Sequence, residues 1–420
     1  MSEPAAPAGD GSGRADDAAP VPHGPAPASA PPGGRARRAM PRPPVTSETF
    51  ASPLHDRRAA AWLGLSLGIA FTTCFLTGLL SHLIQYPPGW FAWPARPAGL
   101  YRITQGLHVA TGIAAVPLLL AKLWVVYPSF WSWPPLRTVT HAVERISLVP
   151  LVGGSLFTLF SGVANIARWY PWHFNFPATH YWVAWITIGG LVVHIGAKLP
   201  VSAEVIRRRR PADAPADVEH AGLSRRGLLG AAFAASGLLT LVTLGQTLRP
   251  LDRLGFLAPR RPKNGPQGLP VNKTATGAKV VDAANDPEFR LTVKGRGVTR
   301  PLSLTLADLR AMPQHEAVLP IACVEGWSST ATWSGVRVRD LLELAGAKKG
   351  STVRVESLQP RGAYRASTLN EHHAADVDTL LALDLFGEPL HIDHGFPVRL
   401  IGPNRPGVLQ TKWVTRLVVK

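Results

Sequence analysis

The chain has 420 residues and a formal net charge of +17, with 44 lysine and arginine side chains against 27 aspartate and glutamate. Only 17% of the residues are charged and 46% are hydrophobic, which argues against a nucleic-acid binder and favours a membrane protein. The two cysteines, Cys74 and Cys323, exclude a disulfide scaffold, an iron–sulfur protein and a cysteine-rich zinc site. The length suffices for two or three domains.

The first 50 residues are rich in Ala, Pro and Gly, and their one aromatic residue is Phe50. Such a segment lacks the apolar residues that a packed core needs, so we expect a disordered tail over residues 1–50. The tail also lacks the apolar run of a secretory signal peptide. We therefore expect the N-terminus to stay in the cytoplasm.

Five uncharged apolar stretches follow, each close to the roughly 20 residues that a helix needs to cross a bilayer. They cover about 59–83, 103–121, 146–167, 178–197 and 227–248. Together they predict a membrane unit in three parts: a four-span domain over 51–206, a basic cytoplasmic linker over 207–226 and a fifth anchoring span over 227–248. Cys74 lies in the first span, where we expect a buried apolar thiol.

The orientation follows from basic residues, which are enriched in the cytoplasmic loops of membrane proteins. With the N-terminus inside, the inner segments hold Arg57, Arg58, Lys122, Arg137, Arg145, Lys198, Arg207–Arg210, Arg225 and Arg226. The outer loops hold only Arg96, Arg102 and Arg168. This excess predicts a multi-pass protein of the cell membrane, with lipid as a partner, and an odd number of spans places the C-terminal domain outside the cytoplasm. The arginine run at 207–210 is an expected anchor beside anionic lipid.

The fifth span opens with Ser224-Arg225-Arg226-Gly227-Leu228-Leu229. This order resembles a twin-arginine export signal, which a receptor reads before it moves a protein already folded around its cofactor. The alternative is that Arg225 and Arg226 are ordinary anchors at the cytoplasmic surface.

A linker rich in Pro, Gly and Arg covers 249–270, and the remaining segment, 271–420, has the pattern of a soluble domain. Alternating apolar residues predict strands at 290–294, 353–356 and 413–419. Short helical patterns are expected at 306–310, 338–344 and 376–383. The sequence therefore predicts an all-α transmembrane bundle followed by an α+β domain.

Histidines in the spans are functional candidates, because ionisable residues are costly in a bilayer. His180 and His194 are 14 residues apart on the fourth span, which puts them on one helix face with a rise of about 21 Å. That spacing suits two haems at different depths, each iron held by two imidazoles. Depth in the predicted topology pairs His108 with His180 and His55 with His194. His82 is a rival ligand, and hydrogen bonding between helices is the alternative role.

These spans resemble the four-helix cytochrome b family that includes the b subunit of respiratory formate dehydrogenases. The matching residues are Thr77-Gly78, Leu107-His108, Gly112-Ile113, Ser161-Gly162-Val163 and the His180/His194 pair. The resemblance implies haem b, one or two per chain. His55 lies further from the Thr-Gly pair than the first-span ligand of that family.

Cys323 is the second candidate centre, because an apolar strand pattern ends there and a loop containing Gly326 begins. A thiolate in such a place can ligate a metal, and a small buried thiol is the alternative. Further along, His394-Gly-Phe-Pro-Val-Arg399 precedes Lys412. Two cations and a histidine in a glycine-containing segment can hold a phosphate.

The segment 271–420 resembles the molybdopterin domain of the sulfite oxidase family, which includes a periplasmic methionine sulfoxide reductase subunit. The resemblance implies a molybdenum–molybdopterin cofactor with Cys323 as the catalytic metal ligand. The implied pterin and phosphate contacts are Asn272, His394, Arg399, Gln410, Thr411 and Lys412. The residues after Cys323, Val-Glu-Gly-Trp-Ser, are nearer the bacterial reductase pattern than the sulfite oxidase one.

These features predict a membrane-bound molybdopterin-dependent oxidoreductase that exchanges electrons between an exported molybdenum site and membrane haem b or the quinone pool. The expected reaction is oxygen-atom transfer to or from a small substrate of the S- or N-oxide type, and the resemblance favours reduction. The alternative is a non-enzymatic membrane cytochrome b whose exported domain is a degenerate docking module. Nucleic acid is not an expected partner.

Overall fold

The computed structural model describes residues 45, 47–50, 52, 54–133, 138–207, 224–244, 253–258, 260 and 264–420. The expected disordered tail up to residue 44, Arg137, and the basic linker from 208 to 223 lie outside the described residues. The same holds for residues 245–252 of the predicted fifth span and following linker.

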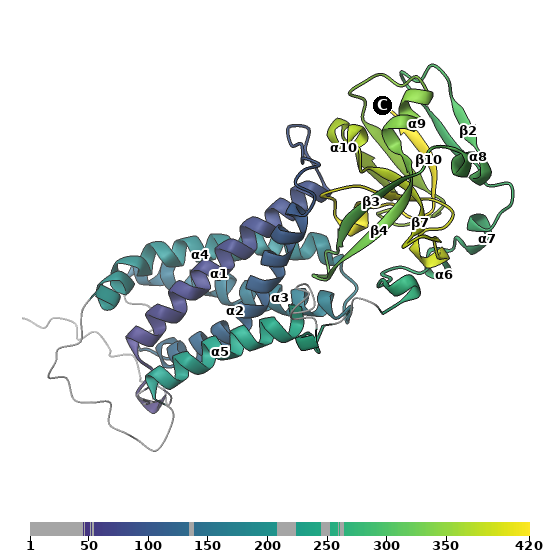
Figure 1. Ribbon diagram of the computed structural model, residues 1–420. Helices are drawn as coiled ribbons and strands as arrows, with labels where there is room; N and C mark the ends of the chain where they lie inside the picture. Colours follow the sequence, from purple (N-terminus) through teal and green to yellow (C-terminus); the bar gives the residue numbers. More distant parts are fainter. Residues whose placement is uncertain are drawn as a thin grey trace, which may run out of the picture. The chain divides into compact units, whose positions relative to one another are not determined.

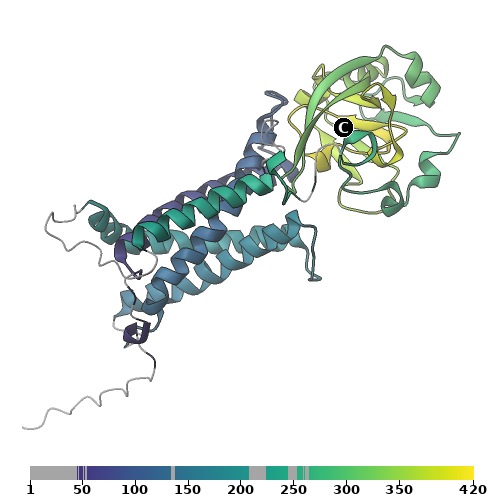
Figure 2. The same ribbon diagram turned by 60° about the horizontal axis from the view of Figure 1, so that its bottom comes forward.

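Five long apolar helices form the first part of the described chain: α1 (Arg57–Gln85), α2 (Leu100–Phe130), α3 (Val139–Ile166), α4 (Phe176–Arg207) and α5 (Arg225–Leu244). A short 3-10 turn, η1 (Ser47–Phe50), precedes them. Each helix has the length and hydropathy to cross a membrane. The five predicted spans are therefore confirmed as helices, and Figures 1 and 2 show them lying side by side.

Local sequence explains where several helices begin. The Asp56 carboxylate accepts hydrogen bonds from the first free amides of α1, and the Thr138 hydroxyl does the same for α3. Asp56 also pairs with Arg225 at the start of α5, with 3.4 Å between Nη1 and Oδ2. Proline occurs inside α2, α3 and α4, a feature tolerated in membrane helices. Contacts join α1 to α2, α3 to α4 and α5 to α2.

Large apolar side chains remain exposed on these helices. Ile69 is 62% exposed, Val149 is 74% and Val192 is 65%. Apolar surface on this scale marks a face that another apolar phase covers. Because the helices are also long enough to cross a bilayer, these exposed faces suit contact with lipid.

The segment after η4 (Pro266–Gly268) folds around two five-stranded sheets. The first has the order β2 (Leu302–Leu304), β1 (Leu291–Gly295), β10 (Val414–Val419), β5 (Val353–Ser357), β6 (Ala366–Leu369). The second has β3 (His315–Ala322), β4 (Ser328–Arg337), β7 (Leu380–Leu385) and β8 (Glu388–Pro389) in order, with β9 (Arg399–Ile401) also paired to β7. Only β1 and β10 pair in parallel among these strands. Figure 1 shows β3, β4 and β7 in this domain.

Short helices lie between the strands: α6 (Ala275–Ala278), α7 (Val281–Ala284), α8 (Leu306–Ala311), α9 (Val338–Leu344), α10 (Glu371–Ala375) and the 3-10 turns η5 (Ile392–His394) and η6 (Gly407–Leu409). The predicted strands at β1, β5 and β10 and the helices at α8 and α9 are confirmed. The helix expected over 376–383 is wrong, because residues 380–385 form β7. That strand is buried on both faces, so its apolar run lacks the period that separates a strand from a helix.

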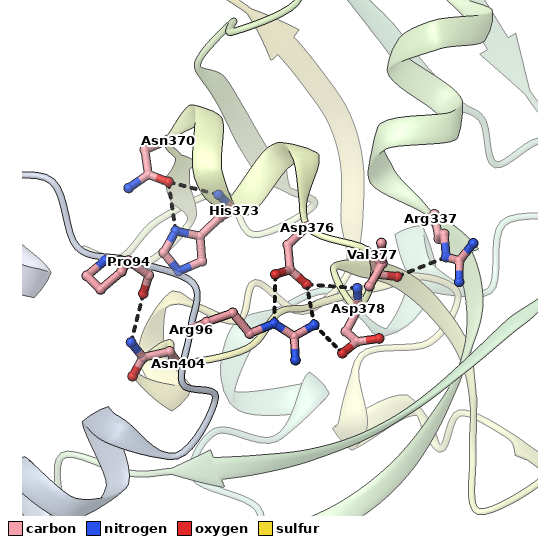
Figure 3. Close-up of polar contacts among 9 residues, drawn as sticks. All are labelled: Pro94, Arg96, Arg337, Asn370, His373, Asp376, Val377, Asp378 and Asn404. Carbon is pink, nitrogen blue, oxygen red and sulfur yellow. Dashed lines mark hydrogen bonds and ion pairs between the residues drawn. The ribbon is translucent and has the colours of Figure 1, made fainter.

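Residues 45–420 form one compact unit, and the connection between α1 and α2 contacts the sheet domain. Asn404, 1% exposed, donates from Nδ2 to Pro94 O (2.7 Å) and accepts at Oδ1 from the Tyr101 amide (2.7 Å). The Trp93 indole donates to Asn404 O at 2.9 Å. Figure 3 shows Arg96 directed between Asp376 and Asp378, with its Nε 3.0 Å from Asp376 Oδ2. This connection thus fixes the sheet domain to the first two helices.

The substitution Arg96→Ala is expected to weaken this docking only slightly. The Arg96 side chain is 51% exposed, and exposed ion pairs contribute about 0–1 kcal/mol and weaken in salt. Asn404→Ala should cost more, roughly 1–3 kcal/mol, since it leaves buried partners unpaired. Urea unfolding of both variants in detergent, at low and high salt, measures the difference. Equal costs, or a cost for Arg96→Ala that salt leaves unchanged, would contradict this ranking.

Candidate functional site

Cys323 lies at the first loop position after β3, as the strand pattern predicts. The loop is a tight turn, with the Gly326 amide donating to Cys323 O and the Cys323 amide donating to Trp327 O. Gly326 has φ +91°, a conformation that favours glycine. The Cys323 side chain is 1% exposed and belongs to the apolar cluster of the second sheet, together with Trp327 and Trp333.

Polar groups nevertheless converge on the Cys323 sulfur. The Asn272 amide Nδ2 lies 2.9 Å from Sγ and the Glu325 backbone amide lies 3.5 Å from it. Burial, with the Glu325 charge, raises the pKa of the Cys323 thiol to about 12. Without a cation the group is therefore a neutral thiol, and a bound metal ion would hold it as a thiolate. The Asn272 and Glu325 amide donors beside the sulfur would stabilise that thiolate form, because they direct N–H groups at the negative charge.

Glu325 adds charge beside this loop. Its carboxylate lies 3.7 Å from Arg168 Nε, 3.9 Å from Arg260 Nε and 3.2 Å from the Trp327 indole nitrogen. Burial raises the pKa of Glu325 above its ordinary value. Arg168 comes from the connection between α3 and α4, so a residue of the helical part contributes to the surroundings of Cys323.

The predicted cations gather at a second point in the domain. Arg399 Nη1 donates to His394 O at 3.0 Å, and the Lys412 ammonium donates to Asp393 O at 2.7 Å. Gly395 makes this approach feasible, because a Cβ on it would lie 3.1 Å from Arg399 Cβ and 3.2 Å from Lys412 Cα. Its φ of +117° also favours glycine. The structure thus brings His394, Arg399 and Lys412 together.

Gln410 and Thr411 are also buried in this region. Thr411 Oγ1 lies 2.7 Å from Ser367 Oγ, and Gln410 Oε1 accepts from the Gly402 amide at 3.3 Å. Arg405, which the sequence reasoning missed, is 5% exposed and donates to Thr368 O and Leu409 O. The available sequence signal was its position between Arg399 and Lys412, six residues after the one and seven before the other.

These residues fit an anionic cofactor. Arg399 and Arg405 are buried cations whose hydrogen bonds go to backbone carbonyls, and the Nε atom of each is buried with no hydrogen-bond partner among the described residues. The Asn272 Oδ1 atom is buried and unpartnered in the same sense. Burial lowers the pKa of Arg399 to about 9 and that of Arg405 to about 10. Buried charges of one sign are costly unless an opposite charge joins them, and the phosphate of a bound cofactor would supply it.

The burial of Lys412 leads us to expect that stabilisation of the fold by a bound anion depends on pH. Burial, then the Arg399 charge, lowers its pKa to about 7, so the cofactor-free fold loses this charge as the pH rises through about 7. Between that value and the ordinary lysine pKa the unfolded chain binds the extra proton, so stability rises with pH. Sulfate should therefore raise the melting temperature of cofactor-free protein more at pH 6 than at pH 9. In Lys412→Met this difference should shrink; an unchanged difference would contradict the assignment.

A second candidate site lies between helices α1–α4. His108 and His180 have ring centroids 6.4 Å apart with the rings 77° to one another. Two imidazoles on opposite sides of one metal ion place their ring centres roughly 6 Å apart, since each metal–nitrogen bond is about 2 Å. Both rings line a cavity of about 240 Å³, whose walls include Gly78, Gly112 and Gly162.

The remaining nitrogen of each ring is held in place. His108 Nδ1 lies 2.8 Å from Cys74 O, and His180 Nδ1 lies 3.1 Å from Ser161 Oγ. Bonds of this kind fix the orientation of metal-ligating histidines and leave Nε2 for the metal. The expectation of a buried apolar thiol at Cys74 is wrong, because Cys74 is only partly buried and its Sγ lies 3.5 Å from His108 Nδ1. The residues fit a haem with two imidazole ligands.

The other predicted pair is arranged differently. His55 Nδ1 lies 3.1 Å from Val125 O and its ring lies 5.9 Å from that of Trp124. His194 Nδ1 is buried and unpartnered among the described residues. No ring contact joins His55 to His194 in the described part of the chain, so a haem between them stays a prediction. His82 stacks on Tyr181 at 3.8 Å and lines the same cavity as His108.

Comparisons with known proteins identify the C-terminal domain. Residues 278–420 match the family model described as the oxidoreductase molybdopterin binding domain. A mitochondrial sulfite oxidase of Rattus norvegicus is 33% identical over 162 residues, covering 32% of this chain and 30% of that protein. A sulfite oxidase of Gallus gallus is 35% identical over 167 residues, covering 33% and 36%.

Two further matches extend these comparisons. A putative protein-methionine-sulfoxide reductase subunit of Azospira oryzae is 34% identical over 139 residues, covering 33% of this chain and 50% of that protein. The crystal structure of the sulfane dehydrogenase SoxCD from Paracoccus pantotrophus matches with 27% identity and a TM-score of 0.29, covering 32% of this chain and 38% of that one. The chain spans about a third to a half of the length of these curated relatives.

Proposed function

We propose that this chain, whose residues 278–420 are a sulfite oxidase-like molybdopterin-binding oxidoreductase domain, exchanges electrons between an exported molybdenum site and the quinone pool through membrane haem b. In this proposal Cys323 ligates the molybdenum, and Asn272, His394, Arg399, Gln410, Thr411 and Lys412 hold the pterin and its phosphate. His108 and His180 hold a haem. The bound cofactor supplies two-electron oxygen-atom transfer, and the protein positions it and sets its potential.

The observation that carries this proposal is the placement of the Cys323 loop on helix α2. Val324 O accepts a hydrogen bond from Gln105, three residues before His108. In this proposal one hydrogen bond thus joins the segment of the molybdenum ligand to the helix of a haem ligand. Fusion of two such sites also keeps their effective concentration high. The intact donor set around Cys323 argues against a degenerate docking domain.

The proposed reaction is reduction of a small S- or N-oxide. Two electrons and two protons convert a sulfoxide to a sulfide and water, and a quinol supplies both electrons. The residues after Cys323 support this direction, as does the Azospira oryzae relative, whose name describes a methionine-sulfoxide reductase subunit. The basic residues at the expected inner helix ends support a cytoplasmic N-terminus and an exported sheet domain. The start of α5 at Arg225 and Arg226 is compatible with the proposed twin-arginine signal.

Metal and haem analysis of protein extracted from membranes tests the proposal. We expect one molybdenum per chain, one or two haems b, and haem reoxidation when methionine sulfoxide is added to the quinol-reduced protein. Protein with haem and no molybdenum would support the non-enzymatic cytochrome. Protein with molybdenum and no haem would remove the haem pathway and leave the oxidoreductase domain.

A further inference from the structure

Gln105 lies on the first turns of α2, inside a buried polar cluster. Its side chain is 5% exposed, that of Ser81 is 7% and that of Tyr101 is 1%. Ser81 Oγ donates to Gln105 Oε1 at 3.0 Å, and the Tyr101 hydroxyl lies 3.4 Å from the same oxygen. A buried amide is costly unless both its ends are paired, so this cluster needs a partner for the nitrogen.

That partner is the backbone of the Cys323 loop. Gln105 Nε2 donates to Val324 O at 3.0 Å. Because Ser81 and Tyr101 face the oxygen of the amide, the nitrogen is directed at the loop. The Val324 carbonyl is one peptide unit from Cys323, and Gln105 is one helical turn from His108. A single hydrogen bond therefore links the segment of the metal-ligand candidate to the helix of the haem-ligand candidate.

A second contact sits beside the first. A Cβ placed on Gly326 would lie 2.9 Å from Val109 Cγ1 and 3.1 Å from Cγ2, so the loop backbone rests on the Val109 side chain. Val109 is 6% exposed and follows His108 directly. Glycine at 326 thus permits an approach to α2 that any other residue would prevent.

Further hydrogen bonds join the sheet domain to the chain at and just before the start of α2. The Asn404 side chain binds the Tyr101 amide and Pro94 O, and Asn370 Nδ2 donates to Trp93 O at 3.0 Å. Figure 3 shows Pro94, Asn370 and Asn404 near the Arg96 pairing with Asp376 and Asp378. The sheet domain that carries the Cys323 loop is therefore also held at the start of α2 by Asn404 and Asn370.

We propose that Gln105 is a positioning residue that seats the Cys323 loop on α2 beside His108, so that electrons pass between the two sites across one hydrogen bond. The inference rests on the proposed function. Each transfer moves one electron, oxidises one site and reduces the other, and makes or breaks no bond. The quinol named above is the source of the electrons.

The test uses the full-length protein in detergent with the substitution Gln105→Leu. Leucine keeps the side-chain bulk and removes the donor to Val324 O. Hydrogen exchange of the backbone amides from Cys323 to Ser328 should become faster, since the loop loses its partner. After reduction by quinol, reoxidation of the haem by methionine sulfoxide should slow by up to about tenfold, the factor by which loss of one buried hydrogen bond lowers the equilibrium constant for the loop bound to α2. Molybdenum content, haem content and sulfoxide reduction driven by reduced viologen should stay at wild-type levels.

Gln314→Leu is the matched control. Gln314 is another glutamine whose side-chain nitrogen donates to backbone carbonyls, those of Leu309 and Met312 at 2.8 Å, and none of its hydrogen bonds within the described residues reaches the Cys323 loop or the Ser81, Tyr101 and Gln105 cluster. Exchange of residues 323–328 should therefore stay as in the wild type in this variant.

A second pair of variants tests the contact between the Cys323 loop and α2 without changing Gln105. Gly326→Ala should lift the loop from Val109 and slow haem reoxidation, and Val109→Ala added to it should restore part of the rate. Unchanged loop exchange and unchanged reoxidation in both Gln105→Leu and Gly326→Ala would overturn the inference. Absence of haem from the wild type would instead overturn the proposed function, and loop exchange would still decide the role of Gln105.

Discussion

We expect the substitution Cys323→Ser to abolish turnover with methionine sulfoxide and to leave the haem absorption unchanged. A serine hydroxyl does not replace a thiolate as a ligand of molybdenum. Even removal of a group that only hydrogen-bonds a metal ligand lowers metal affinity or activity by about 10–100-fold. We therefore expect a loss of more than about 100-fold. The assay uses reduced viologen as donor, so that it reports on the molybdenum site alone.

The controls separate this effect from misfolding. Serine has nearly the same size, and the Asn272 amide that donates to Sγ can donate to the hydroxyl as well. The melting temperature and the haem spectrum should therefore match those of the wild type. Full activity in a folded Cys323→Ser protein would refute the assignment of Cys323 as metal ligand.

His180→Ala should remove the haem held with His108. The alanine variant lacks one of the two ligating imidazoles, and His82, which also lines the cavity, is stacked on Tyr181 instead of facing His108 in a ring pair. Haem content, measured as the reduced pyridine complex, should fall by one equivalent per chain. Quinol-driven reduction of methionine sulfoxide should fall to background, and reduction driven by viologen should remain.

His173→Ala is the matched control, because His173 is exposed in the connection just before α4. It should keep the full haem content. His194→Ala asks the separate question of a second haem, and a loss of one equivalent there would support the His55–His194 prediction. Unchanged haem content in His180→Ala would show that His180 only hydrogen-bonds Ser161.

The sequence was most informative where chemistry imposes a pattern on the chain. Cys323 follows an apolar strand, and His394, Arg399 and Lys412 are close enough in the chain to share one phosphate. The apolar run at 380–385 was misjudged as part of a helix, because a strand covered on both faces leaves no alternation to read. Arg405 was missed for a related reason: its burial depends on segments distant in the sequence.

Hydropathy by itself determined that this protein has five membrane-length helices, and histidine spacing gave the candidate haem ligands His55, His108, His180 and His194. The resemblance of residues 271–420 to a known family implied the molybdopterin domain and its ligand Cys323. Such features are local, since bilayer thickness and ligand chemistry act on short segments. Only the tertiary structure decided that Gln105 contacts Val324, that Gly326 rests on Val109 and that Asn404 holds the start of α2. These contacts join residues some 200 to 300 positions apart, where no periodicity or spacing constrains the chain and only packing and the pairing of buried polar groups do.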